Sequence, residues 1–251
     1  MAGLRELRLR LGGKTVHYLE TGRGDPVVIA HGLGLSGRFW AKHCEALARA
    51  GHRAIAPDLP GFGLSDGPRP GHSVADTAAW LLAFADALGL EHPVWLGHSI
   101  ATQAVLELAA TAPARARALI LVTPTGAPGP FRRTRQLIAF FCDIAREPFA
   151  LVPAVASEYL RSSLLTFLAT WWRAGRDRPL DKAGRVRCPT LIVAGRRDPI
   201  VSRRFLVRLR RAIPRSRVVG IPGGAHGVMF ARPAAFDAVV IRFLEELRSL
   251  D

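Results

Sequence analysis

Apolar residues fall into two alternating patterns along the chain. Short continuous apolar runs indicate buried strands, and longer stretches in which apolar positions recur every three or four residues indicate helices. The expected strands cover residues 27–30, 54–56, 94–98, 118–122, 189–195 and 217–219, and the expected helices cover 39–50, 74–88 and 102–111. Strands that alternate with helices are parallel and joined by crossovers, so the pattern predicts an α/β fold with a mostly parallel sheet.

Two regions depart from this alternation. Leucines alternate with arginines over residues 7–11, two glycines follow, and residues 15–19 return, which predicts a hairpin at the start of the chain. Between residues 123 and 186 the strand pattern stops, prolines break the chain, and two helical patterns follow, over 137–144 and 160–172. We therefore expect an inserted helical segment.

One serine stands where a strand gives way to a helix. Ser99 directly follows the expected strand 94–98, with Gly97 two residues before it and Ala101 two residues after it. A tight strand-to-helix turn that presents a nucleophile needs small residues at both positions, because larger side chains would collide with the crossing backbone. Glycine is the usual residue at the second position, and Ala101 departs from that pattern.

A serine hydroxyl is a poor nucleophile at neutral pH and needs a base, together with a group that orients the base. Asp198 follows the expected strand 189–195, and His226 lies in a glycine-rich loop after the strand 217–219. Both are thus expected at the same edge of the sheet as Ser99. Asp58 and Asp66 are rival carboxylates beside turns, where aspartate usually caps backbone N–H groups.

A loop after the expected strand 27–30 would complete the site. In His31-Gly32-Leu33-Gly34 the glycines free the backbone, so the N–H groups of Leu33 and Ile100 could hold a developing oxyanion. His31 is expected to fix this loop by hydrogen bonds, and His98 to pack against the sheet. The remaining histidines lack the spacing of metal ligands, and neither a metal nor a cofactor is expected.

The chain order serine, aspartate, histidine, each after a strand, resembles the α/β-hydrolase superfamily. The similarity runs almost end to end and includes Ala56-Pro57-Asp58-Leu59-Pro60-Gly61-Phe62-Gly63-Leu64-Ser65, which resembles the turn after the fourth strand in that family. The resemblance implies a mostly parallel eight-stranded sheet with helices on both faces and a helical cap inserted after strand 6. It implies a hydrolase core at 1–123 and 187–251, with the cap at 124–186 forming one structural unit with it.

The nucleophile narrows the activity that the resemblance implies. Haloalkane dehalogenases and epoxide hydrolases of this family have aspartate at the position of Ser99, whereas serine implies acyl transfer and an esterase-like serine hydrolase. Perhydrolases usually have an aromatic residue at the position of Leu33 and methionine at that of Ile100, and C–C hydrolases tend to have an aromatic residue at that of Gly227. The alternatives left open are a carrier-protein methyl esterase, a C–C bond hydrolase and a non-enzymatic small-molecule receptor.

The substrate pocket is expected to be mostly apolar, as small-molecule sites usually are. Large apolar residues of the inserted segment are the candidates for its wall. The expected pocket residues are His31, Phe140, Phe141, Leu168, Trp171 and Trp172.

The net charge of +15 lies mainly in the second half, where residues 123–251 hold 23 of the 35 basic residues. Of these 35, 32 are arginine, which suggests a coding bias as much as a binding surface. Apolar residues at 201, 205, 206 and 209 place the arginines of that segment on a solvated helix face. No nucleic-acid partner is expected, and an acidic carrier protein would fit the basic residues at 131–135 and Arg146.

Size and cysteine usage set the remaining bounds. A chain of 251 residues, 49% of them hydrophobic, can bury one large core as a single domain. Cys44, Cys142 and Cys188 are odd in number and widely spaced, which argues against a disulfide framework. The first residues lack the pattern of a signal peptide, so a cytoplasmic protein acting on a small-molecule ester is expected.

Overall fold

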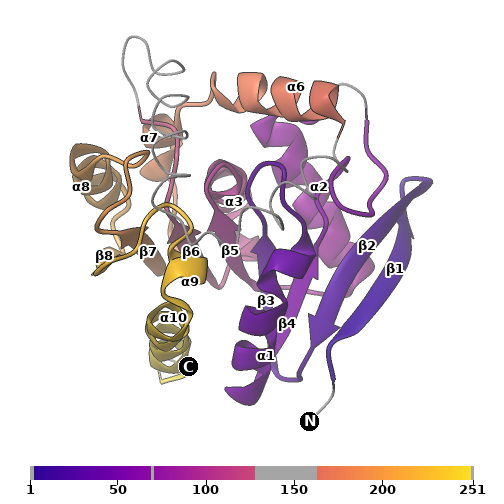
Figure 1. The fold of residues 1–251 in the computed structure, drawn as a ribbon, viewed down its shortest axis with the longest axis horizontal. Helices are drawn as coiled ribbons and strands as arrows, with labels where there is room; N and C mark the ends of the chain where they lie inside the picture. Colours follow the sequence, from indigo (N-terminus) through magenta and orange to yellow (C-terminus); the bar gives the residue numbers. More distant parts are fainter. Residues whose placement is uncertain (1–2, 69–70, 128–162, 250–251) are drawn as a thin grey trace.

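The computed structural model describes residues 3–68, 71–127 and 163–249. Its centre is an eight-stranded sheet in the order β1-β2-β4-β3-β5-β6-β7-β8 (Figure 1). The first two strands form the expected hairpin, β2 also pairs with β4 in antiparallel fashion, and all other neighbours are parallel. The strands are β1 (Arg5–Leu11), β2 (Lys14–Thr21), β3 (Asp25–Ala30), β4 (His52–Pro57), β5 (Val94–His98), β6 (Ala118–Val122), β7 (Thr190–Gly195) and β8 (Ser216–Ile221).

Helices cover both faces of the sheet (Figure 1). Side chains alternate across a strand, so Val28 of β3 packs into one apolar cluster while Val27 and Ile29 pack into the other. The first cluster includes α2 (Val74–Ala87), α3 (Ala101–Thr111), α7 (Pro179–Ala183) and α8 (Arg203–Ala212); the second includes α1 (Ala41–Arg49), α9 (Val228–Ala231) and α10 (Pro233–Arg248). Two short 3-10 helices are η1 (Gly37–Trp40) and η2 (Pro113–Arg115). The predicted α/β-hydrolase architecture is thereby confirmed.

The described part of the inserted segment includes one longer helix, α6 (Leu164–Ala174). In Figure 1 it crosses above α2 and α3. The helical pattern at 137–144, the basic residues at 131–135, Arg146 and Cys142 lie outside the described residues. The division into a core and a cap remains a prediction.

Two sequence expectations about the surface and the thiols hold in the fold. In α8, Phe205 and Leu209 are buried while the arginines are exposed. Cys44 and Cys188 are buried free thiols, and burial raises the pKa of Cys44 to about 12 and that of Cys188 to about 11. Among the helices that the structure describes, none is both long and apolar enough to cross a membrane.

Candidate active site

Ser99 sits on a strained turn between β5 and α3. Its φ of 54° lies in the left-handed region, which costs a non-glycine residue about 1–3 kcal/mol and occurs mainly at functional positions. The turn is held by the Ser99 N–H, which donates to the Val122 carbonyl over 2.9 Å, and by the Thr102 N–H, which donates to the Ser99 carbonyl over 3.1 Å. The backbone thus projects Ser99 at the carboxyl end of the sheet.

The residues two before and two after Ser99 are as closely packed as the sequence predicts. A Cβ atom on Gly97 would lie 2.8 Å from both the Ala101 carbonyl oxygen and Val105 Cγ2. Ala101 itself is only 2% exposed. The methyl group of Ala101 is accommodated, but little room remains around it.

We expect Ala101→Val to lower both the melting temperature and the catalytic activity, because two further methyl groups must enter a filled turn, which typically costs about 1–3 kcal/mol. Ala101→Gly should keep wild-type activity, since glycine fits the turn. Thermal unfolding and kcat/KM of the two variants check this. A valine variant that matches wild type in both would contradict the packing described for this turn.

Three side chains from three loops form a hydrogen-bonded chain. His226 Nε2 lies 2.8 Å from Ser99 Oγ, and His226 Nδ1 lies 2.9 Å from Asp198 Oδ2. An ionised carboxylate can only accept, so Nδ1 carries the imidazole proton and Nε2 is left to accept the Ser99 hydroxyl proton. The structure therefore brings together all three residues that the sequence singled out.

The surroundings of Asp198 fix the position of its side chain and keep the carboxylate ionised. Its side chain is 1% exposed, and Oδ1 accepts hydrogen bonds from the N–H groups of Ile200 at 2.7 Å and Val201 at 3.0 Å. Burial raises the pKa of Asp198, but the charge and hydrogen bond of His226 and the two backbone N–H groups outweigh it and lower the pKa overall. The carboxylate stays ionised beside the imidazole.

Close backbone approach explains how the two loops meet. A Cβ atom on Gly195, at the end of β7, would lie 2.2 Å from the Ala225 carbonyl oxygen. The Arg197 N–H donates to the Gly224 carbonyl over 2.9 Å. Glycine at 195 therefore lets the loop that carries Asp198 lie directly against the loop that carries His226.

His31 fixes the loop that contains Leu33, as predicted. Its Nδ1 lies 2.8 Å from the Gly32 carbonyl oxygen, and its Nε2 accepts the Leu59 N–H over 2.8 Å. Both ring nitrogens are thus used by a neutral ring. Burial lowers the pKa of His31, although the Asp58 carboxylate and the Gly32 carbonyl oppose the shift.

The N–H groups of Leu33 and Ile100 are free of the turn bonds around them. The local backbone hydrogen bonds use Gly32 O with Leu35 N, and Ile100 O with Gln103 N. Within the residues that the structure describes, neither of the two N–H groups donates to a backbone acceptor in these turns. Both residues also line the pocket described below.

The rival carboxylates cap turns, as expected. Asp58 accepts the N–H of Gly37 at 2.6 Å and of Leu64 at 2.8 Å, and it also contacts His17 Nδ1 at 2.9 Å. Asp66 accepts the Thr15 N–H over 2.8 Å. Neither carboxylate reaches His226 by a hydrogen bond.

His98 is buried, and its ring also approaches His226. Its ring centroid lies 6.1 Å from that of Trp40 and 5.5 Å from that of His226. A Cβ atom on Gly32 would lie 2.6 Å from His98 Nδ1, so the ring also abuts the loop of Leu33. Burial, with a further contribution from His226, holds the pKa of His98 well below its ordinary value.

Because these histidines are buried and neutral, we expect the protein to lose stability in mild acid. His31 and His98 have lowered pKa values in the folded state. Below about pH 6.5 the unfolded chain binds protons that the folded chain does not. The free energy of unfolding therefore decreases as the pH is lowered, by up to about 1.4 kcal/mol per pH unit for each such histidine. Urea unfolding at pH 7.5 and 5.5 measures the slope. His98→Gln should make the dependence of the unfolding free energy on pH shallower. An unchanged slope would refute the claim that His98 is neutral in the folded protein.

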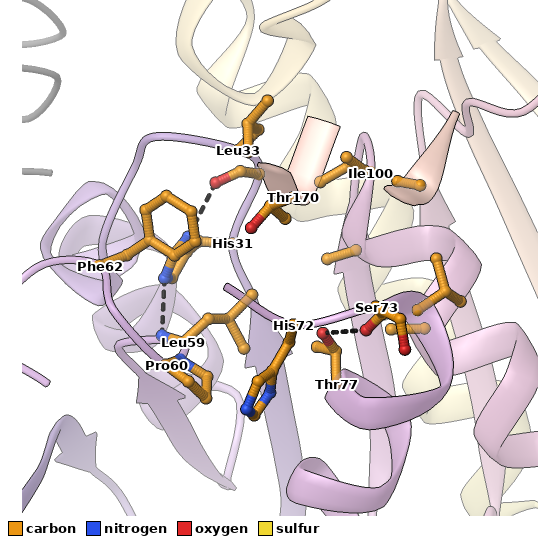
Figure 2. Close-up of a pocket in the computed structure, with 15 residues that line it drawn as sticks. His31, Leu33, Leu59, Pro60, Phe62, His72, Ser73, Thr77, Ile100 and Thr170 are labelled. Atoms are coloured by element: carbon orange, nitrogen blue, oxygen red, sulfur yellow. Dashed lines mark hydrogen bonds between the residues drawn. The ribbon is translucent and has the colours of Figure 1, made fainter. Parts of the chain in front are cut away.

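A pocket opens between the Leu33 loop, the start of α2 and the underside of α6 (Figure 2). Of the expected pocket residues, His31 lines this pocket. Leu33 and Ile100, the residues expected to hold the oxyanion, line it as well. From α6, however, the lining residues are Thr170 and Ala174, and Trp171 is not among them. Leu168 and Trp172 are each 46% exposed, while Phe140 and Phe141 lie outside the described residues.

The helical period explains this difference. Thr166, Thr170 and Ala174 are spaced four residues apart and so share one face of α6, and Thr166 and Ala174 are buried. A Cβ atom on Gly61 would lie 2.9 Å from Thr166 Cγ2, which shows how closely this face approaches the loop after β4. The side of α6 that packs against the body is made of small residues, of which Thr170 and Ala174 line the pocket.

Comparisons with known proteins identify the family of the chain and its fold. Residues 25–143 match the family model for the alpha/beta hydrolase fold, and residues 153–249 match the model described as TAP-like protein. A putative carbamate hydrolase RutD of Azorhizobium caulinodans is 30% identical, over 94% of this chain and 97% of that protein. A putative non-heme chloroperoxidase of Synechocystis sp. is 26% identical, over 92% and 95%. The solved esterase from Exiguobacterium antarcticum superposes with a TM-score of 0.84 at 18% identity, over 98% of this chain and 100% of that one, which shows the fold.

Proposed function

The chain belongs to the α/β-hydrolase superfamily, and from this premise we propose that it hydrolyses carboxylic esters through an acyl-enzyme formed on Ser99. The observation that carries the proposal is the continuous hydrogen-bonded chain from Ser99 through His226 to Asp198. Such a chain supplies a nucleophile, a base and the group that orients the base.

In the proposed mechanism each residue has one step. Ser99 Oγ attacks the ester carbonyl carbon and passes its proton to His226 Nε2, while Asp198 stabilises the imidazolium. The carbonyl oxygen becomes negative and accepts hydrogen bonds from the N–H groups of Leu33 and Ile100. The imidazolium then protonates the leaving alcohol, and water, activated by the same imidazole, releases the acid from Ser99.

The residue at position 99 supports acyl transfer over alkyl transfer. An oxygen nucleophile that depends on a base adds to a carbonyl carbon, and its acyl ester is cleared by water. The pocket beside Leu33 and Ile100 is largely apolar, which suits an uncharged ester better than a charged one. The carbamate named for the relative from Azorhizobium caulinodans is also an acyl compound, so carbamates form the second substrate class to test.

A panel of p-nitrophenyl esters from acetyl to dodecanoyl, with a p-nitrophenyl carbamate, tests the proposal. We expect many turnovers per protein molecule and the highest kcat/KM on short or medium acyl chains. A carbamate hydrolysed far faster than every ester would replace the ester assignment. Halogenation or peroxide-dependent activity without ester turnover would instead point to the chemistry named for the chloroperoxidase relative.

Two further arms separate the remaining alternatives. The kcat/KM for the methyl ester of an acyl-carrier protein should not exceed the kcat/KM for the small esters. A kcat/KM that is higher by orders of magnitude for the carrier ester, and that loses this advantage at high salt, would favour electrostatic docking of an acidic carrier. The absence of multiple turnovers on every compound would favour a small-molecule receptor or a C–C bond hydrolase on this scaffold. Ester turnover that continues at a constant rate excludes that reading.

A further inference from the structure

The pocket beside the candidate oxyanion loop contains two buried polar atoms without a partner. Among the residues that the structure describes, His72 Nδ1 and Thr170 Oγ1 are inaccessible to solvent and make no hydrogen bond. Both residues line the pocket, Thr170 from α6 and His72 from the segment before α2. In the view of Figure 2, Thr170 lies toward Leu33 and Ile100, and His72 lies toward Leu59 and Pro60.

The other polar side chains of this pocket are already engaged. His31 uses both ring nitrogens, as described above. Ser73 Oγ accepts the Asp76 N–H over 3.1 Å, and Thr77 Oγ1 donates to the Ser73 carbonyl over 2.8 Å. Among the side chains of the described lining, His72 Nδ1 and Thr170 Oγ1 are therefore the buried polar atoms that have no hydrogen bond.

Such atoms are costly when they have no partner. A buried donor or acceptor without a hydrogen bond has lost the bonds that it makes to water in the unfolded chain, and this destabilises the fold. A ligand that brings its own hydrogen-bonding group removes this cost, and a ligand without one leaves it in place. The pocket is built to distinguish the two.

The electrostatic surroundings indicate an uncharged ligand group. Burial lowers the pKa of His72; Asp76 opposes the shift, and Lys14 and Arg173 add to it. The imidazole is thus neutral at neutral pH, and the Thr170 hydroxyl is neutral and can both donate and accept. The rest of the described lining is mainly aliphatic or aromatic and contains no Asp, Glu, Lys or Arg side chain, which favours an uncharged group.

The size of the pocket sets the length of the group. The space open to the centre of a water molecule is about 30 Å³, which corresponds to about two water molecules. Ser99 is not itself among the described lining residues, but Ile100 and Ala101, which directly follow it in the chain, and Leu33 of the candidate oxyanion loop are. A group in the pocket would thus lie beside a carbonyl bound at Ser99 in the proposed mechanism. This room suits an acyl group of a few carbons.

On the proposed ester hydrolysis, we propose that this pocket is an acyl subsite for short acyl chains that carry an uncharged hydroxyl or carbonyl group, bound by Thr170 and His72. Each neutral hydrogen bond gained should raise kcat/KM by about three- to tenfold relative to the plain chain. Thr170 and His72 act here as specificity residues and take no part in the acyl transfer.

Four ethyl esters with a four-carbon acyl group test the subsite by pH-stat titration: butyrate, 3-hydroxybutyrate, acetoacetate and monoethyl succinate. Rates are normalised to alkaline hydrolysis of each ester. We expect 3-hydroxybutyrate and acetoacetate to exceed butyrate by about three- to tenfold. Thr170→Val keeps the shape of the side chain and should abolish most of this preference. Thr166→Val, the same change one turn away on α6 and outside the pocket lining, should keep the wild-type ratio.

Failure of the subsite and failure of the ester reaction give different results. Hydrolysis of ethyl butyrate with no preference for the oxygenated esters, or an equal preference in Thr170→Val, would overturn the subsite alone. A monoethyl succinate rate above all others would overturn the uncharged assignment. If no ester is hydrolysed, the subsite is tested by NMR titration of Ser99→Ala with ethyl 3-hydroxybutyrate and ethyl butyrate. The subsite requires that ethyl 3-hydroxybutyrate binds more tightly than ethyl butyrate. In Ser99→Ala/Thr170→Val the two esters should bind with equal affinity.

Discussion

Ser99→Ala should lower kcat for ester hydrolysis by about 10⁶-fold, because it removes the hydroxyl that lies 2.8 Å from His226 Nε2 and that attacks the carbonyl carbon in the proposed mechanism. The loss should not come from unfolding. Alanine meets the same backbone strain at φ 54° as serine, and the small side chain leaves the turn intact. Turnover of p-nitrophenyl butyrate and the thermal unfolding midpoint should be measured on the same preparation. An alanine variant with more than a hundredth of wild-type kcat would remove Ser99 from the proposed role.

Asp198→Asn should lower kcat by about 10⁴-fold, through the imidazole tautomer. The N–H groups of Ile200 and Val201 require an acceptor at this position, so the asparagine carbonyl would face them and its NH₂ would face His226 Nδ1. Nδ1 would then have to accept, the ring proton would move to Nε2, and no lone pair would remain for the Ser99 hydroxyl.

Asp66→Asn is the matched control for that variant. Asp66 is also a carboxylate that accepts a backbone N–H, but it lies at a turn on the surface and forms no bond with His226. Its substitution should leave kcat at the wild-type value. If both asparagine variants lose activity alike, the cause is general and the assigned tautomer is wrong.

The strands and the hydrogen-bonded chain could be predicted because local patterns encode them. Apolar runs identify strands that are buried on both faces, as in β5 and β7, where every residue is buried. Chemistry-bearing residues in the loops after parallel strands meet at one edge of the sheet, which is why Ser99, Asp198 and His226 converge, although β8, the strand before His226, is mostly exposed or half-buried. His31 was predictable for a similar reason, since it follows β3 and precedes two glycines.

The pocket wall could not be predicted by the same means. Large apolar residues are the usual candidates for a pocket wall, but the side of α6 that faces the body carries Thr166, Thr170 and Ala174. The leucines at 164, 165 and 168 are 46–70% exposed. The helical spacing of the small residues was visible. What could not be seen was that Gly61 and Gly71 of a distant loop allow close approach to that face.

The sequence also does not reveal which buried polar atoms of the pocket have no hydrogen-bond partner. Threonine and histidine mostly find partners when buried, and nothing local distinguishes Thr170 from Thr77, whose hydroxyl bonds to its own helix. Only the relative placement of α2, α6 and the loop after β4 separates them.

The most direct test of the central claim is covalent labelling with a fluorophosphonate, followed by peptide mass spectrometry. The proposed mechanism requires one adduct per chain, on the peptide that contains Ser99, forming at a rate that falls sharply in Asp198→Asn and to zero in Ser99→Ala. An adduct on any other residue, or labelling of Ser99→Ala at the wild-type rate, would contradict it.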